Sequence, residues 1–294
     1  MKLNNQQLQA FYQVAINRNF HLAAAKIHIT QSALSQRIMK LEAQLGTTLI
    51  IRANDGIALT YAGEQLFRHT QNLLSMEEET LASISGQDET QLSGSLRIAS
   101  YSSILQSAII PAVAPILRQS TDIHVEFSSR EMAAMPAMLK SGEVDFITLD
   151  HFIEGFDLES IQIGLEYLIH VQNIEHYSPG QVFLDHDIYD ITTINFLKRQ
   201  KVEKTDINRC FYDDIYGILT GLKEGLGQAV ISRHLVPDDD NIRCVPYPRS
   251  VTTPVVLYYN KNRYLTRLQK AVIKTLKDQV PIYLEACKKD GVPL

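Results

Sequence analysis

Apolar residues recur every three or four positions through the first part of the chain, which is the spacing of helices with one buried face. The clearest stripe has steps of four, three and four, and consists of Leu34, Ile38, Leu41 and Leu45. Thr30 stands just before it, and a threonine hydroxyl is a good N-terminal cap for a helix. The pattern therefore predicts a helix over 31–45, preceded by helices over 4–17 and 20–27.

Two short runs typical of strands follow these helices, over 49–52 and 57–60. The residues between them read Ala-Asn-Asp-Gly, which is typical of a tight turn between antiparallel strands. The pattern predicts a β-hairpin. The predicted helices over 20–27 and 31–45 are joined by a tight turn, as in a helix-turn-helix. A hairpin after it is the winged form of that motif, in which the hairpin can reach the DNA backbone or minor groove.

A long helix is predicted next, from a cap at Thr60 to about residue 85. Its apolar residues form two adjacent rows at a spacing close to seven: Leu66, Phe67, Leu73, Leu74 and Leu81. Such a seam favours dimerisation through the helix, because a lone helix would leave it exposed to water. The alternative is that the helix packs against its own C-terminal domain. Residues 85–95 are rich in serine, glycine and acidic residues, which indicates a hinge.

Strand and helix patterns alternate through the rest of the chain. Strands are predicted over 96–100, 123–127, 144–149, 167–171, 182–184, at Phe211, over 228–232 and over 255–259. Helices are predicted over 102–118, 131–140, 213–224 and 264–277. Such alternation predicts a mainly parallel sheet covered on both faces, with a ligand site beside the carboxyl ends of the strands.

The face of the 31–45 helix opposite its apolar stripe is polar. Together with the residues at the helix start, it presents Thr30, Gln31, Ser32, Ser35, Gln36 and Arg37. Glutamine can pair with adenine, serine with several base edges, and arginine with guanine or phosphate. These residues are therefore candidates for reading DNA. The alternative is an ordinary solvated face, which any amphipathic helix has.

The charge distribution supports the DNA interpretation more than the net charge of −5 does. Residues 1–65 contain six basic and three acidic residues, a balance of +3, so the remainder carries −8. A basic end module on an acidic body fits a DNA-reading domain attached to a sensor. Because the positive excess is small, we expect few phosphate contacts per protomer, and strong binding would need a dimer.

Composition also bears on other functional classes. No window approaches 18 uncharged apolar residues and the N-terminus lacks an apolar run, so we expect a cytoplasmic protein with no membrane contact. Cys210, Cys244 and Cys287 are far apart and show no metal-binding spacing, and no cofactor motif is present. No catalytic motif supports an enzyme.

Residues 8 to 63 resemble the N-terminal domain of the LysR-type transcriptional regulators. The matching residues are Leu8, Phe11, Val14, Phe20, Ala23, Ala24, His28, Gln31, Ala33, Leu34, Ser35, Ile38, Leu41, Glu42, Leu45, Gly46, Leu49, Arg52, Leu59, Thr60, Ala62 and Gly63. Ser32 and Ile50 depart from the family pattern, which often has proline and phenylalanine there. The resemblance implies that Arg52, in the wing, holds phosphate or enters the minor groove.

The remainder resembles that family's effector domain, which is similar to periplasmic binding proteins. The matching segments are 95–98, 139–148 and 225–236. The resemblance implies an α+β multidomain chain with a winged helix-turn-helix over 1–60, a dimerisation linker over 61–91 and an α/β effector domain over 92–294. Its two subdomains would cover about 92–163 with 267–294, and about 164–266.

The resemblance places an effector between these subdomains. The candidate residues are Ser100, Tyr101, Ser102, Ser103, Ser128 and Thr148 on one side and Asp185 on the other. Hydroxyls and free N–H groups favour a carboxylate, and Asp185 favours an ammonium, so an amino acid would satisfy both sides. The alternative is that the serines cap a helix and that Asp185, His186 and Asp187 form a surface loop. Adjacent strand residues point to opposite faces, which argues against a metal site there.

The sequence thus predicts a DNA-binding transcriptional regulator, not an enzyme, that responds to a small-molecule effector. Double-stranded DNA, the effector, RNA polymerase and further copies of the chain, as a homodimer or homotetramer, are the partners that this interpretation implies. Two alternatives are a solute-binding protein with a structural N-terminal domain and a regulator that responds to no ligand.

Overall fold

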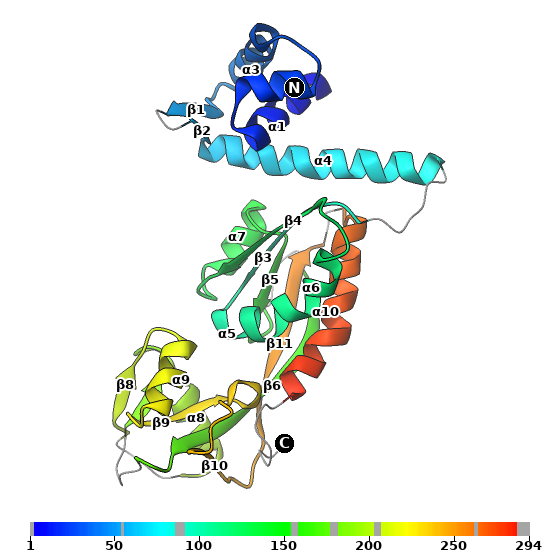
Figure 1. Ribbon diagram of the computed structural model, residues 1–294. Coiled ribbons are helices and arrows are strands. Elements are labelled where there is room, and N and C mark those ends of the chain that lie inside the picture. The colour runs from blue at the N-terminus through cyan, green and yellow to red at the C-terminus, as the bar shows by residue number, and fades with distance from the viewer. Residues whose placement is uncertain are drawn as a thin grey trace.

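The computed structural model describes residues 3–53, 56–85, 92–153, 158–176, 182–202, 207–261 and 264–286. Three parts follow one another along the chain. A small N-terminal domain lies on one side of a long helix, α4 (Tyr61–Ser85), and an elongated α/β domain lies on its other side (Figure 1). The predicted order of winged helix-turn-helix, linker helix and two-lobed α/β domain is confirmed.

The N-terminal domain packs its helices around one apolar core. The helices are α1 (Asn5–Asn17), α2 (Phe20–Lys26) and α3 (Gln31–Leu45). The predicted stripe of α3 supplies Leu34, Ile38 and Leu41 to this core. The hairpin follows as β1 (Ile50–Ala53) paired antiparallel with β2 (Gly56–Leu59). The tip of the predicted turn, at positions 54 and 55, lies outside the described residues.

Side-chain caps set where these helices begin. The Thr30 hydroxyl accepts a hydrogen bond from the backbone N–H of Ala33 at 3.2 Å, so α3 begins where the sequence predicts. The Thr60 hydroxyl accepts one from the N–H of Gly63 at 2.9 Å and fixes the start of α4. Such caps satisfy donors that the first helical turn leaves without a partner.

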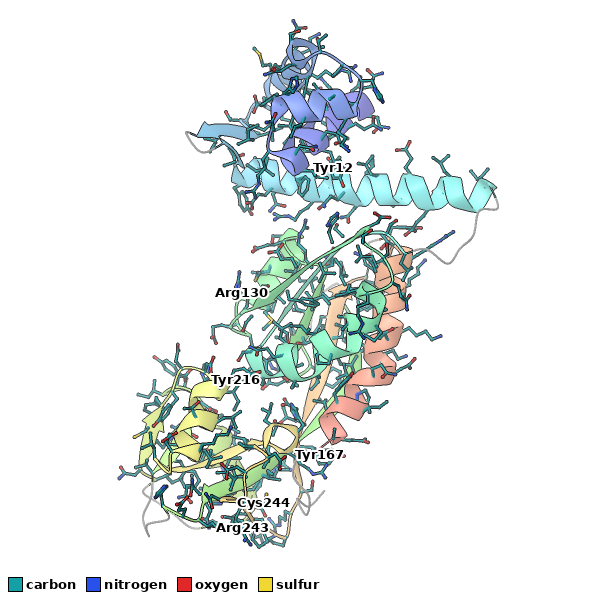
Figure 2. The ribbon with its side chains drawn as sticks, in the orientation of Figure 1. Tyr12, Arg130, Tyr167, Tyr216, Arg243 and Cys244 are labelled. Carbon is teal, nitrogen blue, oxygen red and sulfur yellow. The ribbon has the colours of Figure 1, made fainter. Side chains whose placement is uncertain are left out.

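The first turns of α4 belong to the N-terminal domain. Leu66 is buried in that domain's core, with Phe67 and Leu73 packed against it. The ring of Phe67 in α4 stacks on the ring of Tyr12, a residue of α1 on the side that faces α4 (Figure 2). Leu66 therefore faces its own domain and is not free to contact a partner. The prediction that Leu66 belongs to the dimerisation seam was wrong. Further along the helix Leu81 is 60% exposed.

The described part of the α/β domain contains one nine-stranded sheet, with eight strands in the order β4-β3-β5-β11-β6-β9-β7-β8 and β10 paired to β6. The strands are β3 (Gly94–Ser100), β4 (Ile123–Ser129), β5 (Phe146–Leu149), β6 (Leu158–Asn173), β7 (Phe183–Asp185), β8 (Arg209–Phe211), β9 (Gln228–Ser232), β10 (Ile242–Val245) and β11 (Val251–Asn260). β3 pairs parallel with β4 and β5, and β7 pairs parallel with β8 and β9.

The prediction of a mainly parallel sheet was wrong. Between the two parallel blocks β6 and β11 run antiparallel to each other, and they also pair antiparallel with β5, β9 and β10. The predicted strands over 167–171 and 255–259 are pieces of these two long strands. Each continues from one lobe into the other, and the expected boundary near residue 163 lies inside β6.

Subdomain I, the lobe beside α4, has helices on both faces of its strands. One face carries a continuous helical stretch made of α5 (Ser102–Ile104), a π-helical turn (Leu105–Ile109) and α6 (Ile110–Leu117), together with α10 (Arg267–Glu285). The other face carries α7 (Met135–Ser141). Ile98 packs toward α6 and α10, and its neighbour Ala99 packs toward α7, as alternation along a strand requires.

Subdomain II repeats this arrangement with α8 (Thr192–Arg199) and α9 (Ile215–Lys223). Phe183 packs with α8 and Leu184 with α9. Three features were not predicted from the sequence: the helix α8, the strand β10 and the first half of β6. The first half of β6 holds Gly164, and a Cβ there would approach the Cδ1 atom of Leu284 in α10 to 2.5 Å.

Candidate functional site

Among the residues predicted to read DNA, Ser32, Ser35 and Gln36 lie on the side of α3 away from its core stripe, and Thr30, Gln31 and Arg37 lie at its start or flank that side. Thr30, Gln31, Ser32 and Gln36 are exposed, while Ser35 and Arg37 are half-buried. The opposite side is sealed by the core residues of the helix. Short hydroxyl and amide side chains thus stand on the convex surface of a helix, where they can enter a DNA major groove.

Thr30 also has a structural task. Its hydroxyl caps α3 and lies 3.0 Å from the Ser32 hydroxyl, so both groups hydrogen-bond at the helix start. Gln36 has an exposed amide, which can reach a base edge. Met39, which the spacing along the sequence places on the same polar face, and Lys40, which was not predicted, are further exposed residues of α3. Lys40 adds a positive charge beside the polar face.

Arg52 lies in β1, where its backbone is opposite Ile57 of β2. The hairpin therefore places it on the wing, as the sequence predicts. Its side chain lies outside the described residues, and its role in holding phosphate stays a prediction.

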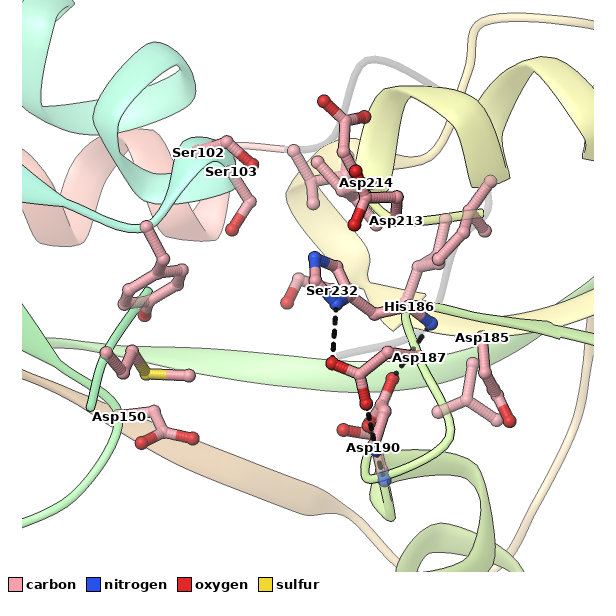
Figure 3. Close-up of a pocket in the computed structure, with 18 of the residues that line it drawn as sticks. Ser102, Ser103, Asp150, Asp185, His186, Asp187, Asp190, Asp213, Asp214 and Ser232 are labelled. Carbon is pink, nitrogen blue, oxygen red and sulfur yellow. Dashed lines mark hydrogen bonds and ion pairs between the residues drawn. The ribbon is translucent and has the colours of Figure 1, made fainter. Parts of the chain in front are cut away.

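A second candidate site is a cavity of about 530 Å³ between the two subdomains. Tyr101, Ser102 and Ser103 of subdomain I and Asp185 of subdomain II line it, as predicted. The cavity volume lies within the range that small organic ligands need. Figure 3 shows the two serines facing the acidic residues of subdomain II across the cavity.

Three predicted residues do not line this cavity. The hydroxyls of Ser100 and Thr148 lie 2.5 Å apart and are buried beneath it, since their strands turn these side chains into the interior. Ser128 lies one position before Ser129, which lines the cavity in its place. Alternation of side chains along a strand explains this shift.

Asp185 lines the cavity but is already neutralised. Its carboxylate pairs with the Nε atom of Arg209 and accepts a hydrogen bond from the Thr193 hydroxyl at 2.5 Å. Only 3% of this residue is exposed. The geometry therefore does not favour the predicted role of Asp185 as the partner of a ligand ammonium, because Arg209 already supplies its counterion inside subdomain II.

The lining is strongly acidic, which was not recognised from the sequence. Besides Asp185, the carboxylates are those of Glu131, Asp150, Glu166, Asp187, Asp190, Asp213 and Asp214. Arg130 and His186 are the basic residues among the described residues that line the cavity. Several of these acids come from the ends of strands and the loops after them, and Figure 3 shows them on both walls.

Glu166 lies in the floor of the cavity, on β6, where the two subdomains join. Its two carboxylate oxygens accept hydrogen bonds from the Ser232 hydroxyl at 2.5 Å and the Tyr101 hydroxyl at 2.9 Å. Burial raises the pKa of Glu166, although both hydrogen bonds act in the opposite direction. Burial, together with the charge of Glu166, also raises the pKa of Tyr101 well above its usual value. A signal for this residue was its charge within the otherwise uncharged, mostly apolar run of residues 163–169.

Neither a metal centre nor a membrane segment is found in the part of the chain that the structure describes. No three histidine, cysteine or carboxylate side chains gather there in a way that could hold a metal ion. None of the described helices is long and apolar enough to cross a membrane.

Two family models match the chain. The model described as "bacterial regulatory helix-turn-helix protein, lysR family" matches residues 5–64. The model described as "LysR substrate binding domain" matches residues 89–281, which is well over half of the chain. The two matches correspond to the N-terminal domain and to the α/β domain that contains the cavity.

Similar proteins agree with these models. An uncharacterised helix-turn-helix transcriptional regulator of Shigella flexneri, YfeR, is 32% identical over 146 residues; the match covers 50% of this chain and 47% of YfeR, about half of its length. The structure of ArgP from Mycobacterium tuberculosis matches 98% of this chain and 99% of its own, with a TM-score of 0.61 and 17% identity. The structure of full-length CbnR complexed with its target DNA matches 94% of this chain and 99% of its own, with a TM-score of 0.53 and 16% identity.

Proposed function

The chain belongs to the LysR family of bacterial helix-turn-helix transcriptional regulators, and on this premise we propose that it reads specific operators as a homo-oligomer under the control of a small molecule. The observation that carries the proposal is the exposed polar face of α3 on a fully packed helix-turn-helix domain. CbnR, which shares the fold, is described in complex with its target DNA. The family consists of regulators and not of enzymes.

In this proposal Gln31, Ser32, Ser35, Gln36 and Arg37 meet base edges and Arg52 meets the backbone or minor groove. Each domain carries few basic residues, so two linked heads are needed for strong binding. Pairing through α4 would link them, and DNA is then bound at two related half-sites. The proposed location is the cytoplasm, where DNA and RNA polymerase are available as partners.

The cavity between the subdomains is the proposed effector site. A ligand that contacts both lobes favours one arrangement of them over the other, and this difference in affinity is what shifts a two-state equilibrium. Tyr101 in subdomain I, Glu166 at the junction and Ser232 in subdomain II already form one hydrogen-bonded group across the lobes. Binding beside this group would change how the lobes are held.

Contacts between α4 and subdomain I offer a route from the effector site to the DNA-binding heads. The Glu79 carboxylate on α4 accepts hydrogen bonds from the Arg267 backbone N–H at 2.6 Å and the Tyr264 hydroxyl at 3.0 Å. The Gln71 amide oxygen accepts one from the Arg97 guanidinium at 2.8 Å. A shift of subdomain I would therefore act on the helix that positions the heads.

Selection of bound sequences from a random duplex pool tests the proposal with the full-length protein at near-physiological salt. We expect enrichment of a site with two related half-sites. A triple substitution of Ser32, Gln36 and Arg37 by alanine is the control, and it should abolish enrichment without unfolding the protein. Absence of any enriched sequence with the unmodified protein would contradict the proposal and favour a solute-binding protein.

A further inference from the structure

The charge of the cavity lining is a property of this chain that the proposed function does not explain. Among the described residues, eight carboxylates line the cavity, against one arginine and one histidine. A concave site lined by one sign of charge concentrates ligands of the opposite sign. A ligand with net negative charge would meet repulsion on both walls.

Most of these carboxylates have tasks within the fold. Asp185 pairs with Arg209, and Asp214 caps α9 by accepting hydrogen bonds from the N–H groups of Tyr216 and Gly217. Asp187 accepts hydrogen bonds from the N–H groups of its own loop. Such groups contribute negative potential but have fewer lone pairs left for a ligand.

Glu166 also accepts two hydrogen bonds, but unlike Asp185 it is a buried carboxylate with no ion pair in the part of the chain that the structure describes. It is only 5% exposed, it lines the cavity, and no basic side chain of the described residues pairs with it. Its two partners, Tyr101 and Ser232, are neutral hydroxyls. A buried carboxylate without a counterion is costly in its charged form. A cation in the cavity would supply the missing counterion.

The rest of the lining indicates what kind of cation fits. No group of three possible metal ligands exists among the described residues, so the acids surround the cavity without converging on one point. Aliphatic side chains, including Leu168, Ile218 and Val230, form part of the same wall. The combination suits an alkyl chain that ends in a charged nitrogen group and does not suit a bare metal ion.

We propose that the effector is an aliphatic organic cation whose ammonium or guanidinium group is bound by Glu166, with Asp213 and Asp150 on the two walls. This inference rests on the proposed function, in which the cavity is the effector site. A basic amino acid and a diamine share this chemistry. They differ in the carboxylate, which Ser102, Ser103 and Arg130 of subdomain I are placed to receive.

Cation binding at Glu166 should be coupled to the release of a proton. The groups that face Glu166 are the hydroxyls of Tyr101 and Ser232 and the carboxylate of Asp150. The negative charge of Asp150 also raises the pKa of Glu166. A bound cation favours the ionised form of Glu166 and lowers its pKa. Binding should therefore release protons at pH values near the raised pKa of Glu166, and substitution of Glu166 by glutamine should abolish this release.

Calorimetric titration of the full-length protein with L-arginine, agmatine, L-citrulline and L-glutamate tests the inference. Agmatine lacks the carboxylate, and citrulline replaces the guanidinium by a neutral group of similar shape. We expect arginine or agmatine to bind, and citrulline to bind about 10–100-fold more weakly, the cost of losing one charge-assisted hydrogen bond in a buried site. Comparison of arginine with agmatine, which carries two cationic groups and no carboxylate, decides between a basic amino acid and a diamine-like cation.

The variant Glu166→Gln should bind the cation about 10–100-fold more weakly than the unmodified protein does, and it should release no protons on binding. Glu224→Gln, at an exposed position of subdomain II outside the cavity, removes an equal charge and should bind as the unmodified protein does. Preferential binding of citrulline or glutamate, no binding of either cation, or unchanged binding by Glu166→Gln would overturn the inference. Selection of bound operator sequences with the same protein preparation tests the proposed function separately, because the protein can recognise DNA even if it binds no cation.

Discussion

At the scale of single residues, two buried carboxylates of the cavity, those of Asp185 and Glu166, have different roles. Asp185 and Glu166 are both buried and both line the cavity. Asp185 is neutralised by Arg209 and therefore serves the stability of subdomain II. Glu166 meets hydroxyls only, so its charge is left for a ligand. The neighbouring side chains, and not the residue type, decide which acid is structural.

Gln36 is the residue on α3 best placed to give base specificity. Replacing it by alanine should relax the preference at one operator position, at a cost of about 1–3 kcal/mol if the amide makes a bidentate pair. Binding to a panel of single-base operator variants measures this. Arg52→Ala is the contrasting variant, since loss of a phosphate contact should weaken all sequences alike and lower the salt slope by about one. An unchanged preference in the Gln36 variant would contradict its role.

Asp185→Asn should destabilise subdomain II. The substitution leaves the Arg209 guanidinium without its counterion in a mostly buried position, and breaking a buried ion pair costs about 3 kcal/mol or more. Urea unfolding of the full-length protein measures the loss. Asp187→Asn, at a far more exposed carboxylate of the same loop, should cost much less. Equal stability of the two variants would show that the Asp185 pair contributes nothing.

At the scale of elements, α4 serves two parts of the molecule at once. Its first turns complete the core of the N-terminal domain through Leu66. Its later part meets subdomain I through Glu79 and leaves Leu81 exposed. The helix is thus held at both ends, so it can pass a movement from one domain to the other.

The start of α4 approaches Leu49, the residue before β1, so closely that residue 63 must be glycine. A Cβ at Gly63 would lie 2.1 Å from the carbonyl oxygen of Leu49. Alanine favours helices over glycine by about 1 kcal/mol, but overpacking costs about 1–3 kcal/mol or more, and a backbone carbonyl cannot rotate away. Gly63→Ala should therefore lower the thermal stability of the N-terminal domain and weaken DNA binding. His69→Ala, at an exposed position of α4, is the control and should do neither.

The exposed apolar residues of α4 test the proposed dimer. Leu81→Glu should raise the dimer dissociation constant, because it places a charge in an apolar seam. Sedimentation at several protein concentrations measures the change. His69→Glu introduces the same side chain at an exposed position elsewhere on α4 and should leave association intact. If both variants dimerise as the unmodified protein does, the interface lies elsewhere.

At the scale of the whole molecule, the two lobes are joined by continuous strands and by side chains. β6 and β11 run through both lobes. The Ser107 hydroxyl of subdomain I lies 2.9 Å from the Nε2 atom of His234 in subdomain II. The Arg233 guanidinium donates to the carbonyl of Glu285 at the end of α10. The lobes can change their relative arrangement only by bending these strands and altering these contacts.

His234 should make stability depend on pH. Burial lowers its pKa from 6.5 to about 4, and its Nδ1 atom has no hydrogen-bond partner among the described residues. The folded protein therefore keeps the ring neutral while the unfolded chain binds a proton. The stability is fully present above pH 6.5 and is lost as pH falls toward about 4, by up to about 3 kcal/mol.

The variant His234→Gln should reduce this loss, measured by urea unfolding near neutral pH and near pH 4. His124→Gln, at an exposed histidine, is the control and should keep the full pH dependence. A variant of His234 that loses stability with acid just as steeply as the unmodified protein would show that another group is responsible.

The sequence by itself determined the local features of this protein. The helix over 31–45 begins at the Thr30 cap and buries the predicted stripe, because caps and apolar spacing act within a few residues. The hairpin and the start of α4 follow from the same local signals. Of the candidate sites, the polar face of α3 and the cavity residues Tyr101, Ser102 and Ser103 could be predicted, since each set lies on one short segment.

Only the tertiary structure decided the direction of the central strands and the character of the cavity. The strand direction of β6 depends on its partners in both lobes, and no local pattern states it. The cavity unites Tyr101, Glu166 and Ser232 from distant parts of the chain, so its charge was invisible in any single segment. The sequence predicts Asp185 as a ligand contact, but in the structure Arg209, 24 residues further along the chain, pairs with its carboxylate. Charge and burial at such a site are set by neighbours in space, which a linear pattern does not contain.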